Sequence, residues 1–489
     1  MYNSTAPTVI VGGGFVGLFT ALHLSHQSYS EPIILIDPQE RFAFKPLLYE
    51  YLTGEMQDEQ VFPRYEELLS GSKVVFIRDR VTNIDLEQHR LELASGMSYD
   101  YRYLVLGVGS NQGYFGTAGA TDNAFAFRTE QDVTVLARHL QECLQQASQT
   151  EDEQLRHSLL TFAITGAGPA GVEMAATLAD LLPNWYAKLG GSISDIRIVL
   201  VNHGLKILAG DVNAHLRATT LEAFQDRAVP IELLLGVKVT AVAPDRLEYQ
   251  AKTNPESTTL ATRTTIWTAG TATNPLIESL TQIADTSKNK HGLPLVTDTL
   301  QLLDFPEVFA AGDCAVVKEH AYPAVAQIAY QQGKGIAQNL VALTQDRAPQ
   351  PVPANMRGTL MKLGLGQGVA NLFDKVQVKG KPGDLIRNAT YLEMLPTPVH
   401  NFKATTEWLT DEIFHRYASP KSPLKPTETT QKATIRGDLE NTSSTKANSK
   451  IWLGGVISVM ILIVGSIVGW QFVQPWLEQQ PTQEQNSVR

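Results

Sequence analysis

The sequence predicts an α/β protein with two doubly wound parallel sheets, a small C-terminal region and one transmembrane helix. Three observations predict this architecture. Short β-branched runs alternate with longer helical stretches from Thr8 to about Thr344, which is typical of α/β domains. Two of the runs open near-identical glycine motifs, one at Gly12 and the other at Gly166. A long apolar run follows a polar segment near the C-terminus.

The composition limits the classes of function. The chain has 489 residues, more than one hydrophobic core usually serves, so two or three domains are expected. With 43% hydrophobic and 18% charged residues, it is too apolar for a mainly disordered protein. A formal net charge of -10 gives no general attraction to nucleic acid or to anionic lipid, so no nucleic-acid partner is expected.

The chain has only two cysteines, Cys143 and Cys314. Their small number and wide spacing exclude a disulfide scaffold, an iron–sulfur ligand set and a CxxC redox pair. The 11 histidines show no metal-ligand spacing, so no metal site is expected. Any redox chemistry must therefore use an organic cofactor.

Six short apolar runs are expected to be strands of the two sheets. They are Thr8–Val11, Pro32–Ile36, Tyr103–Gly107, Leu160–Thr165, Arg197–Val201 and Val308–Ala310. A further β-like stretch at Gly358–Leu365 and a helix around Trp408–Arg416 are expected in the C-terminal region, to which the pattern assigns no chemistry.

The first glycine motif follows a strand and opens a helix. Gly12 makes the tight turn, Gly14 lets the backbone approach a pyrophosphate, and Gly17 lets the helix lie close to the sheet. The N-terminus of the helix stabilises the phosphate charge. Asp37 ends the next strand, where its carboxylate can accept hydrogen bonds from a ribose. This spacing predicts a dinucleotide-binding, Rossmann-like domain.

The second motif repeats the pattern with Gly166, Gly168 and Gly171. A chain with two such motifs is expected to bind two dinucleotides. Because a flavin and a nicotinamide are the usual pair that exchange hydride, the sequence predicts an FAD enzyme reduced by NADH or NADPH. The run Asp304–Ala315, a strand that enters a glycine turn with an acidic residue, supports this prediction.

The apolar run Ile451–Leu477 contains no Asp, Glu, Lys or Arg. It follows residues 418–450, which are rich in Pro, Ser, Thr and Lys and are expected to form a flexible linker. Because a helix of about 20 residues spans a bilayer, the run predicts a transmembrane helix. A buried core helix is the alternative interpretation.

Charges on the two sides of this run predict its orientation. Arg436, Lys446 and Lys450 precede it, whereas the first charges after it are acidic, so the large N-terminal body is expected on the cytoplasmic side of the membrane. Gly465 and Gly469 form a GxxxG pair, which is a candidate dimer face, although glycines are common in membrane helices.

Residues 8–417 resemble the flavoproteins with two dinucleotide-binding domains, and within them the type II NAD(P)H:quinone dehydrogenases, which are single-subunit, non-pumping respiratory enzymes. Besides the two glycine motifs, the resemblance rests on Phe44–Glu50 (FKPLLYE), Trp267–Gly270 (WTAG), Ala311–Asp313 (AGD) and Ala326–Gly333 (AQIAYQQG). The last motif is the most discriminating.

The resemblance implies the order of the domains up to residue 417, and the sequence pattern adds the linker, the transmembrane helix and the tail as a departure from the family. The assigned ranges are 1–120 and 291–350 for the two parts of a discontinuous FAD-binding domain, 121–290 for the NAD(P)H-binding domain, 351–417 for a membrane-proximal region, 418–450 for the linker, 451–474 for the transmembrane helix and 475–489 for a short tail.

The resemblance also implies roles for particular residues. Gly12, Gly14, Gly17, Asp37 and Asp313 would bind FAD, and Gly166, Gly168 and Gly171 would hold the nicotinamide cofactor. Asn202, Gly270 and Gly312 are further cofactor-binding candidates. Gln327 and Gln331, four residues apart on one helix face, would lie at the quinone pocket. Without the other motifs, a polar helix face would be the preferred interpretation of this pair.

Glu173 would lie near the flavin by the same resemblance, where a carboxylate can orient the nicotinamide or relay protons. The alternative role is a first-turn carboxylate that complements the helix dipole. Asn202 departs from the family pattern, because NADH-using members carry an acidic residue there. A neutral Asn202 with His203 and Lys206 nearby permits the 2′-phosphate of NADPH, so a shift towards NADPH is predicted, although a neutral Asn can also bind a ribose hydroxyl.

The expected activity is hydride transfer from NAD(P)H to FAD, followed by transfer of two electrons to a membrane quinone. Two alternatives stay open: a tethered NAD(P)H oxidase or reductase that uses oxygen or a soluble carrier, and a redox-sensing flavoprotein. The identity of the quinone, the cellular membrane and the oligomeric state also stay open, although a homodimer is common in the family.

Overall fold

The structure is a computed structural model of the chain, and it describes residues 6–209, 214–252, 254–356, 358–372, 376–397, 400–406 and 408. Across these ranges no helix combines the length and the apolar character that crossing a membrane requires. The predicted linker, the predicted transmembrane helix at 451–474 with Gly465 and Gly469, and the tail lie outside the described residues. The helix expected around Trp408–Arg416 is described only at its first residue, which is helical.

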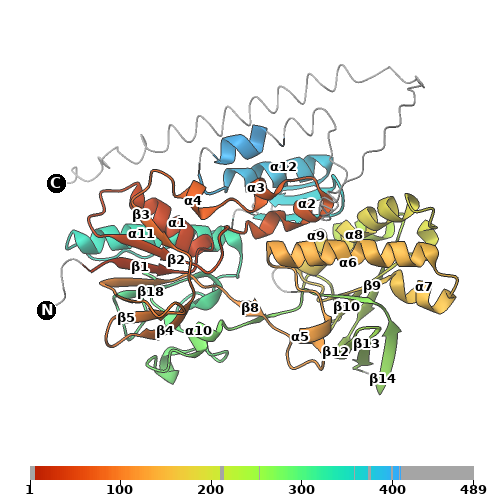
Figure 1. Cartoon of the computed structure of the whole chain (residues 1–489), viewed down its shortest axis with the longest axis horizontal. Coiled ribbons are helices and arrows are strands. Elements are labelled where there is room, and N and C mark those ends of the chain that lie inside the picture. Colours follow the sequence, from red (N-terminus) through yellow and green to blue (C-terminus); the bar gives the residue numbers. More distant parts are fainter. Residues whose placement is uncertain are drawn as a thin grey trace, which may run out of the picture. The chain divides into compact units, whose positions relative to one another are not determined.

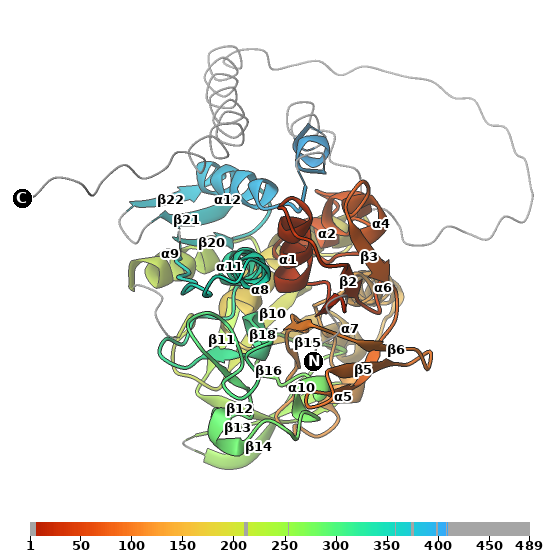
Figure 2. The same cartoon turned by 90° about the vertical axis from the view of Figure 1, so that its left-hand side faces the viewer.

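The first sheet has five parallel strands in the order β18-β7-β1-β2-β3. Their bounds are β1 Thr8–Val11, β2 Ile33–Ile36, β3 Val74–Ile77, β7 Tyr103–Leu106 and β18 Val308–Ala310. The last strand returns from a distant part of the chain, as a discontinuous domain requires. Helices α1 (Phe15–Ser25) and α11 (Ala326–Thr344) pack side by side, as Figures 1 and 2 show.

The second sheet has four parallel strands in the order β11-β10-β9-β15. Their bounds are β9 Thr161–Thr165, β10 Arg197–Asn202, β11 Ile231–Leu235 and β15 Thr264–Trp267. Helices α6 (Glu130–Gln149) and α8 (Pro169–Ala187) lie beside this sheet (Figure 1). Each of the six predicted strands is present, and its ends agree with the prediction to within one residue, because β-branched runs bounded by turn residues are the strongest local signal for buried parallel strands.

A short ribbon connects the two sheets. Strand β8 (Asn111–Gln112), which follows β7, pairs antiparallel with β16 (Thr271–Ala272), which follows β15. The chain therefore leaves the first sheet and returns towards it along two neighbouring strands.

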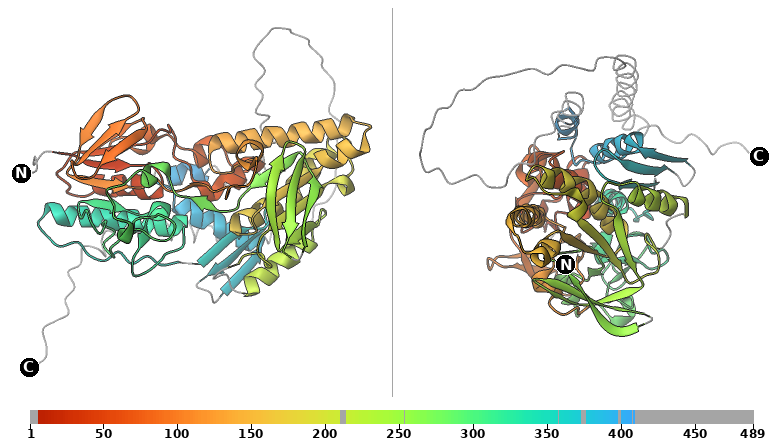
Figure 3. Two further views of the ribbon diagram at one scale, coloured as in Figure 1. Left: turned by 90° about the horizontal axis from the view of Figure 1, so that it is seen from below. Right: turned by 90° about the vertical axis from the view of Figure 1, so that its right-hand side faces the viewer.

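The C-terminal region is a three-stranded antiparallel sheet with one helix. Strands β20 (Gly358–Lys362), β21 (Gly368–Leu372) and β22 (Val376–Gly380) pair in that order, and α12 (Lys381–Glu393) packs on them. Strand β20 also packs against α8, so this region contacts the second sheet's domain (Figure 3). The β-like stretch predicted at Gly358–Leu365 is confirmed from Gly358 to Lys362, where β20 ends.

The remaining elements surround the two sheets. The strands are β4 Val81–Asp85, β5 Arg90–Leu93, β6 Ser98–Asp100, β12 Val237–Ala243, β13 Arg246–Ala251, β14 Asn254–Ala261, β17 Leu295–Val296 and β19 Val316–Val317. The helices are α2 Leu48–Thr53, α3 Asp58–Val61, α4 Tyr65–Leu68, α5 Ala120–Asn123, α7 Glu153–Leu159, α9 Ala214–Gln225 and α10 Pro275–Glu278, with 3₁₀ turns at Lys45–Leu47, Ile193–Asp195, Asp285–Ser287 and Gly312–Cys314.

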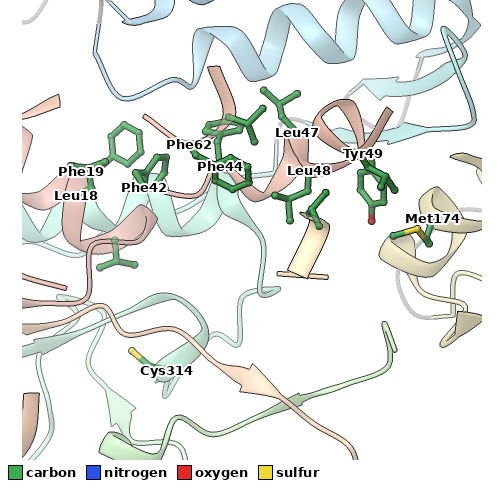
Figure 4. Close-up of a cluster of buried hydrophobic side chains, with 14 of the residues drawn as sticks. Leu18, Phe19, Phe42, Phe44, Leu47, Leu48, Tyr49, Phe62, Met174 and Cys314 are labelled. Carbon is green, nitrogen blue, oxygen red and sulfur yellow. The ribbon is translucent and has the colours of Figure 1, made fainter. Parts of the chain in front are cut away.

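A row of buried side chains runs from the first domain to α8. Figure 4 shows it passing from Phe19 on α1 through Phe42 and Phe44 to Tyr49 on α2, with Met174 of α8 beside it. The Tyr49 hydroxyl donates a hydrogen bond of 2.9 Å to the carbonyl of Ala170 in the first turn of α8. Apolar burial and one hydrogen bond thus fix α2 against the start of α8, which positions the neighbouring residues of both helices.

Candidate functional site

The first glycine turn has the geometry of a phosphate-binding loop. Gly12 has a φ of 95°, which favours glycine, and a Cβ built on Gly17 would lie 1.9 Å from the carbonyl oxygen of Gly12. Only glycine at both positions lets the turn and α1 approach this closely. A Cβ on Gly14 would meet its nearest neighbour at 3.8 Å, so the backbone at the start of α1 is open towards a ligand.

Asp37 closes this turn at the end of β2. The backbone N–H of Gly13 donates to Asp37 Oδ2 at 2.6 Å, and the N–H of Gln39 donates to Oδ1 at 2.8 Å. Burial raises the pKa of Asp37, although both hydrogen bonds act in the opposite direction. The structure therefore brings Gly12, Gly14, Gly17 and Asp37 together as the sequence predicts.

The run Asp304–Ala315 belongs to the same site, because its strand β18 lies in the same five-stranded sheet as β1 and β2. The Ser110 hydroxyl donates to Asp313 Oδ2 at 2.9 Å, and the Arg128 guanidinium donates to the Ser110 carbonyl at 2.6 Å. The N–H of Gly312 donates to the Gln332 side chain of α11 at 2.9 Å. A cation, a carboxylate and an open glycine turn together fit a dinucleotide such as FAD, whose phosphates need N–H donors and cations and whose hydroxyls need acceptors.

The second glycine turn repeats the first. Gly166 has a φ of 99°, and a Cβ on Gly171 would lie 1.8 Å from the carbonyl oxygen of Gly166. A Cβ on Gly168 would meet nothing within 4 Å, so the start of α8 is also open towards a ligand. Gly270, with a φ of 70°, follows β15, which pairs beside β9; its carbonyl accepts a hydrogen bond of 3.1 Å from Gln112 of β8.

Asn202 occupies the position that Asp37 has in the first domain. The N–H of Ala167 donates to Asn202 Oδ1 at 3.1 Å, as the N–H of Gly13 donates to Asp37. The amide nitrogen of Asn202 donates to the carbonyls of Gly204 and Lys206 at 3.1 and 3.2 Å. Asn202 therefore keeps the structural role of the strand-end carboxylate, orders the loop at 202–206 and carries no charge.

Gln327 and Gln331 lie in the first two turns of α11, and their amides bind the protein backbone. Gln327 Nε2 donates to the Gly358 carbonyl at 3.3 Å, and Gln331 Nε2 donates to the Asn355 carbonyl at 3.0 Å. Gln331 Oε1 accepts from the N–H of Asn355 at 3.0 Å. The pair therefore fastens Asn355 and the first residue of β20, Gly358, to α11, which are partners that the sequence did not predict.

Glu173 is the fifth residue of α8 and lies in its second turn, so the alternative role as a first-turn carboxylate is wrong. Its Oε1 accepts a hydrogen bond of 2.7 Å from the backbone N–H of Lys362 on β20. The guanidinium Nε of Arg387 on α12 lies 3.7 Å from the same oxygen. Burial raises the pKa of Glu173 to about 7, because Arg387 only partly offsets the loss of solvent.

A cluster of buried charges surrounds Glu173. Arg387 Nη1 lies 2.6 Å from Glu50 Oε1, and Lys362 Nζ lies 3.0 Å from the same oxygen and 2.6 Å from Glu55 Oε2. Burial by itself would raise the pKa of Glu50, but Arg387 and Lys362 outweigh it and lower this pKa to about 2. Burial raises the pKa of Asp384 to about 6.

The sequence prediction missed most of this cluster. Lys362, Asp384 and Arg387 lie in the region to which the pattern assigned no chemistry. Glu50 appeared only as the last residue of the FKPLLYE motif. A charged residue within an otherwise buried strand, such as Lys362 in β20, was the one local signal that could have pointed to it.

The two cysteines do not form a redox pair. Cys143 lies on α6 and Cys314 in the glycine turn after β18, and both are buried. Burial raises the pKa of each thiol to about 11. Across the described ranges, no group of three or more His, Cys, Asp or Glu is arranged to hold a metal ion.

Comparison with known proteins places this arrangement in a family. The chain is 29% identical over 457 residues to the alternative NAD(P)H-ubiquinone oxidoreductase C1 of Arabidopsis thaliana. This alignment covers 86% of the chain and 84% of that protein. The chain is also 29% identical over 414 residues to the demethylphylloquinone reductase NdbB of Synechocystis sp., with 82% and 95% covered.

The fold is that of a solved structure, NDH2 from Plasmodium falciparum in complex with NADH, with a TM-score of 0.75 at 18% identity over 84% of this chain and 99% of that one. The family model described as pyridine nucleotide-disulphide oxidoreductase matches residues 6–333. Two glycine turns with matched strand-end side chains agree with that match, and the chain therefore belongs to the pyridine nucleotide-disulphide oxidoreductase family.

Proposed function

We propose that the chain is a membrane-anchored, non-pumping oxidoreductase that binds FAD, oxidises NADH or NADPH and reduces a membrane quinone. The observation that carries the proposal is the pair of matched glycine turns, each open at a helix start and each closed by a strand-end side chain. The acceptor is inferred from the two relatives, both named for the reduction of a quinone, which match more than four-fifths of this chain.

In this proposal the first turn, with Asp37 and Asp313, holds FAD, and the second turn holds the nicotinamide nucleotide. Bound FAD supplies the hydride acceptor and the two-electron donor. Glu173 orients the nicotinamide or moves a proton, which its buried position and its pKa near 7 support. Gln327 and Gln331 shape the quinone end by holding Gly358 and Asn355, respectively, in place.

Anaerobic stopped-flow absorbance of the FAD-loaded full chain tests the function. Mixing with NADH or NADPH should bleach the flavin, and a soluble quinone analogue should then restore its absorbance. Bleaching that only oxygen or a carrier protein reverses would contradict quinone reduction and indicate a tethered oxidase or reductase. If neither nucleotide bleaches the flavin, the redox-sensing flavoprotein is the remaining interpretation.

We also propose that Asn202 shifts the preference of the second site towards NADPH. An Asn202→Asp variant should lower the NADPH to NADH ratio of kcat/KM by about tenfold or more, because a carboxylate repels the 2′-phosphate by at least about 1.4 kcal/mol. Steady-state kinetics with both nucleotides measures the ratio. Asn202→Ala is the matched control, since it removes the acceptor for the N–H of Ala167 without adding charge and should weaken the binding of both nucleotides alike. An unchanged ratio in Asn202→Asp would remove this role.

The proposed membrane anchor is the helix at 451–474. It is inferred from the sequence alone, because this run has no charged residue and basic residues precede it. Deleting 418–489 should convert a chain that resists carbonate extraction from membranes into one that carbonate releases. Deleting only 478–489 is the control and should leave the chain anchored. Carbonate resistance in the 418–489 deletion would show that the run is not the anchor.

A further inference from the structure

Arg387 is shared unequally by a buried carboxylate, Glu50, and a partly buried one, Glu173. Arg387 Nη1 donates to Glu50 Oε1 at 2.6 Å, whereas Arg387 Nε lies 3.7 Å from Glu173 Oε1, which is beyond hydrogen-bond distance. This Nε is a buried nitrogen for which the described residues provide no hydrogen-bond acceptor. Arg387 Nη2 donates to the Pro46 carbonyl at 2.8 Å, which helps to hold the guanidinium on the α2 side.

The contacts of Lys362 are also divided between Glu173 and other carboxylates. Its backbone N–H donates to Glu173, but its ammonium group lies against Glu50 and Glu55. Lys362 and Arg387 are both buried, so each charge is stabilised mainly by the carboxylates that it touches. Glu50 is the carboxylate that touches both cations.

Titratable groups on α2, β20 and α12, and one just after α2, lie around Glu173 and its two cations. These are Tyr49 and Glu50 on α2, Glu55 after α2, Lys362 on β20, and Asp384, Arg387 and Tyr391 on α12. Four carboxyl groups face two cations. Glu50 and Glu55 hold the close contacts, and Glu173 is left with one backbone hydrogen bond and a distant guanidinium.

We propose that Glu50 is a positioning residue for Glu173: it holds Arg387 and the Lys362 ammonium away from Glu173, so that Glu173 can take up and release a proton. The charge of Glu50 also acts directly, because it raises the pKa of Glu173 while Arg387 lowers it. Only the use of this proton in turnover rests on the proposed function. The protonation of Glu173 is a property of the chain itself.

The test is an infrared titration of the full, FAD-loaded chain. The carbonyl band of protonated Glu173 is identified as the band that a Glu173→Gln variant lacks, and it is followed as a function of pH. In Glu50→Gln the apparent pKa of Glu173 should fall by about one unit or more, because Arg387 loses its nearest anion and turns towards Glu173. Glu55→Gln is the matched control: it removes an anion from Lys362 but not from Arg387, so it should shift the titration clearly less than Glu50→Gln does.

Glu50→Asp covers the case in which Glu50→Gln does not fold. Its shorter side chain keeps the charge but withdraws from both cations, so a smaller downward shift is expected. A Glu173 titration that is unchanged in a folded Glu50→Gln and in Glu50→Asp, or an equal shift in Glu55→Gln, would overturn the proposal. If the titration shifts as expected but no flavin reoxidation by quinone occurs, the positioning role stands and the proposed function fails.

Discussion

A Glu173→Gln variant is expected to reduce quinone about 10²–10⁴ times more slowly than the unaltered chain while it still binds FAD and NAD(P)H. The amide oxygen of Gln can keep the hydrogen bond from the N–H of Lys362, so the packing of α8 against β20 is retained. What is lost is the exchangeable proton. Stopped-flow reoxidation of the reduced flavin by a quinone analogue measures the rate of this step.

The pH profile gives the same prediction a second readout. Because burial raises the pKa of Glu173 to about 7, this carboxyl keeps its proton below that pH and loses it above. A step that uses the proton should therefore slow as the pH rises through 7, and the slowing should be absent in Glu173→Gln. Glu142→Gln, on the exposed face of α6, is the control and should keep the wild-type profile. A Glu173→Gln variant with full activity and an unchanged profile would remove any role in proton movement.

Replacing Arg387 by Met should lower the free energy of unfolding by about 3–5 kcal/mol, because it leaves Glu50 buried with only one cation. Urea denaturation followed by circular dichroism measures the loss. Arg197→Met is the matched control: it breaks a two-point Arg–Glu pair with Glu232 that is largely exposed and should cost less than about 1 kcal/mol.

A double variant separates charge from packing. If the cost of Arg387→Met comes from the uncompensated carboxylate, then adding Glu50→Gln should restore part of the lost stability. A loss in Arg387→Met no larger than in Arg197→Met would contradict the view that the cluster is held together by buried charge.

The sequence was sufficient for features that depend on local rules. Gly12 and Gly166 need positive φ at a turn, and Gly17 and Gly171 need a missing Cβ, so their spacing alone predicts both turns. Asp37 was predictable for the same reason, because it lies at a fixed distance from the turn at the end of the next strand.

The charge cluster was not predictable, because its contacts join distant segments. Glu50 and Lys362 are separated by 312 positions, and Glu50 and Arg387 by 337. The hydrophobic periodicity of the sequence does not specify which carboxylate pairs with a buried cation. The pair Gln327 and Gln331 shows the intermediate case: their common helix face followed from the four-residue spacing, but their backbone partners at Asn355 and Gly358 followed only from the fold.

The ribbon of β8 and β16 has a consequence for how this chain can change. Asn111 pairs with Ala272 and Gln112 with Thr271, so the ends of the intervening segment meet. Residues 113–270 therefore have the topology of a cassette inserted into a host domain, whose two junctions stay together whatever lies between them. Closing such a junction costs little extra chain entropy as the cassette lengthens, about 0.6 kcal/mol for each doubling of loop length. All five strands of the host sheet lie outside this cassette, so their register does not depend on its length.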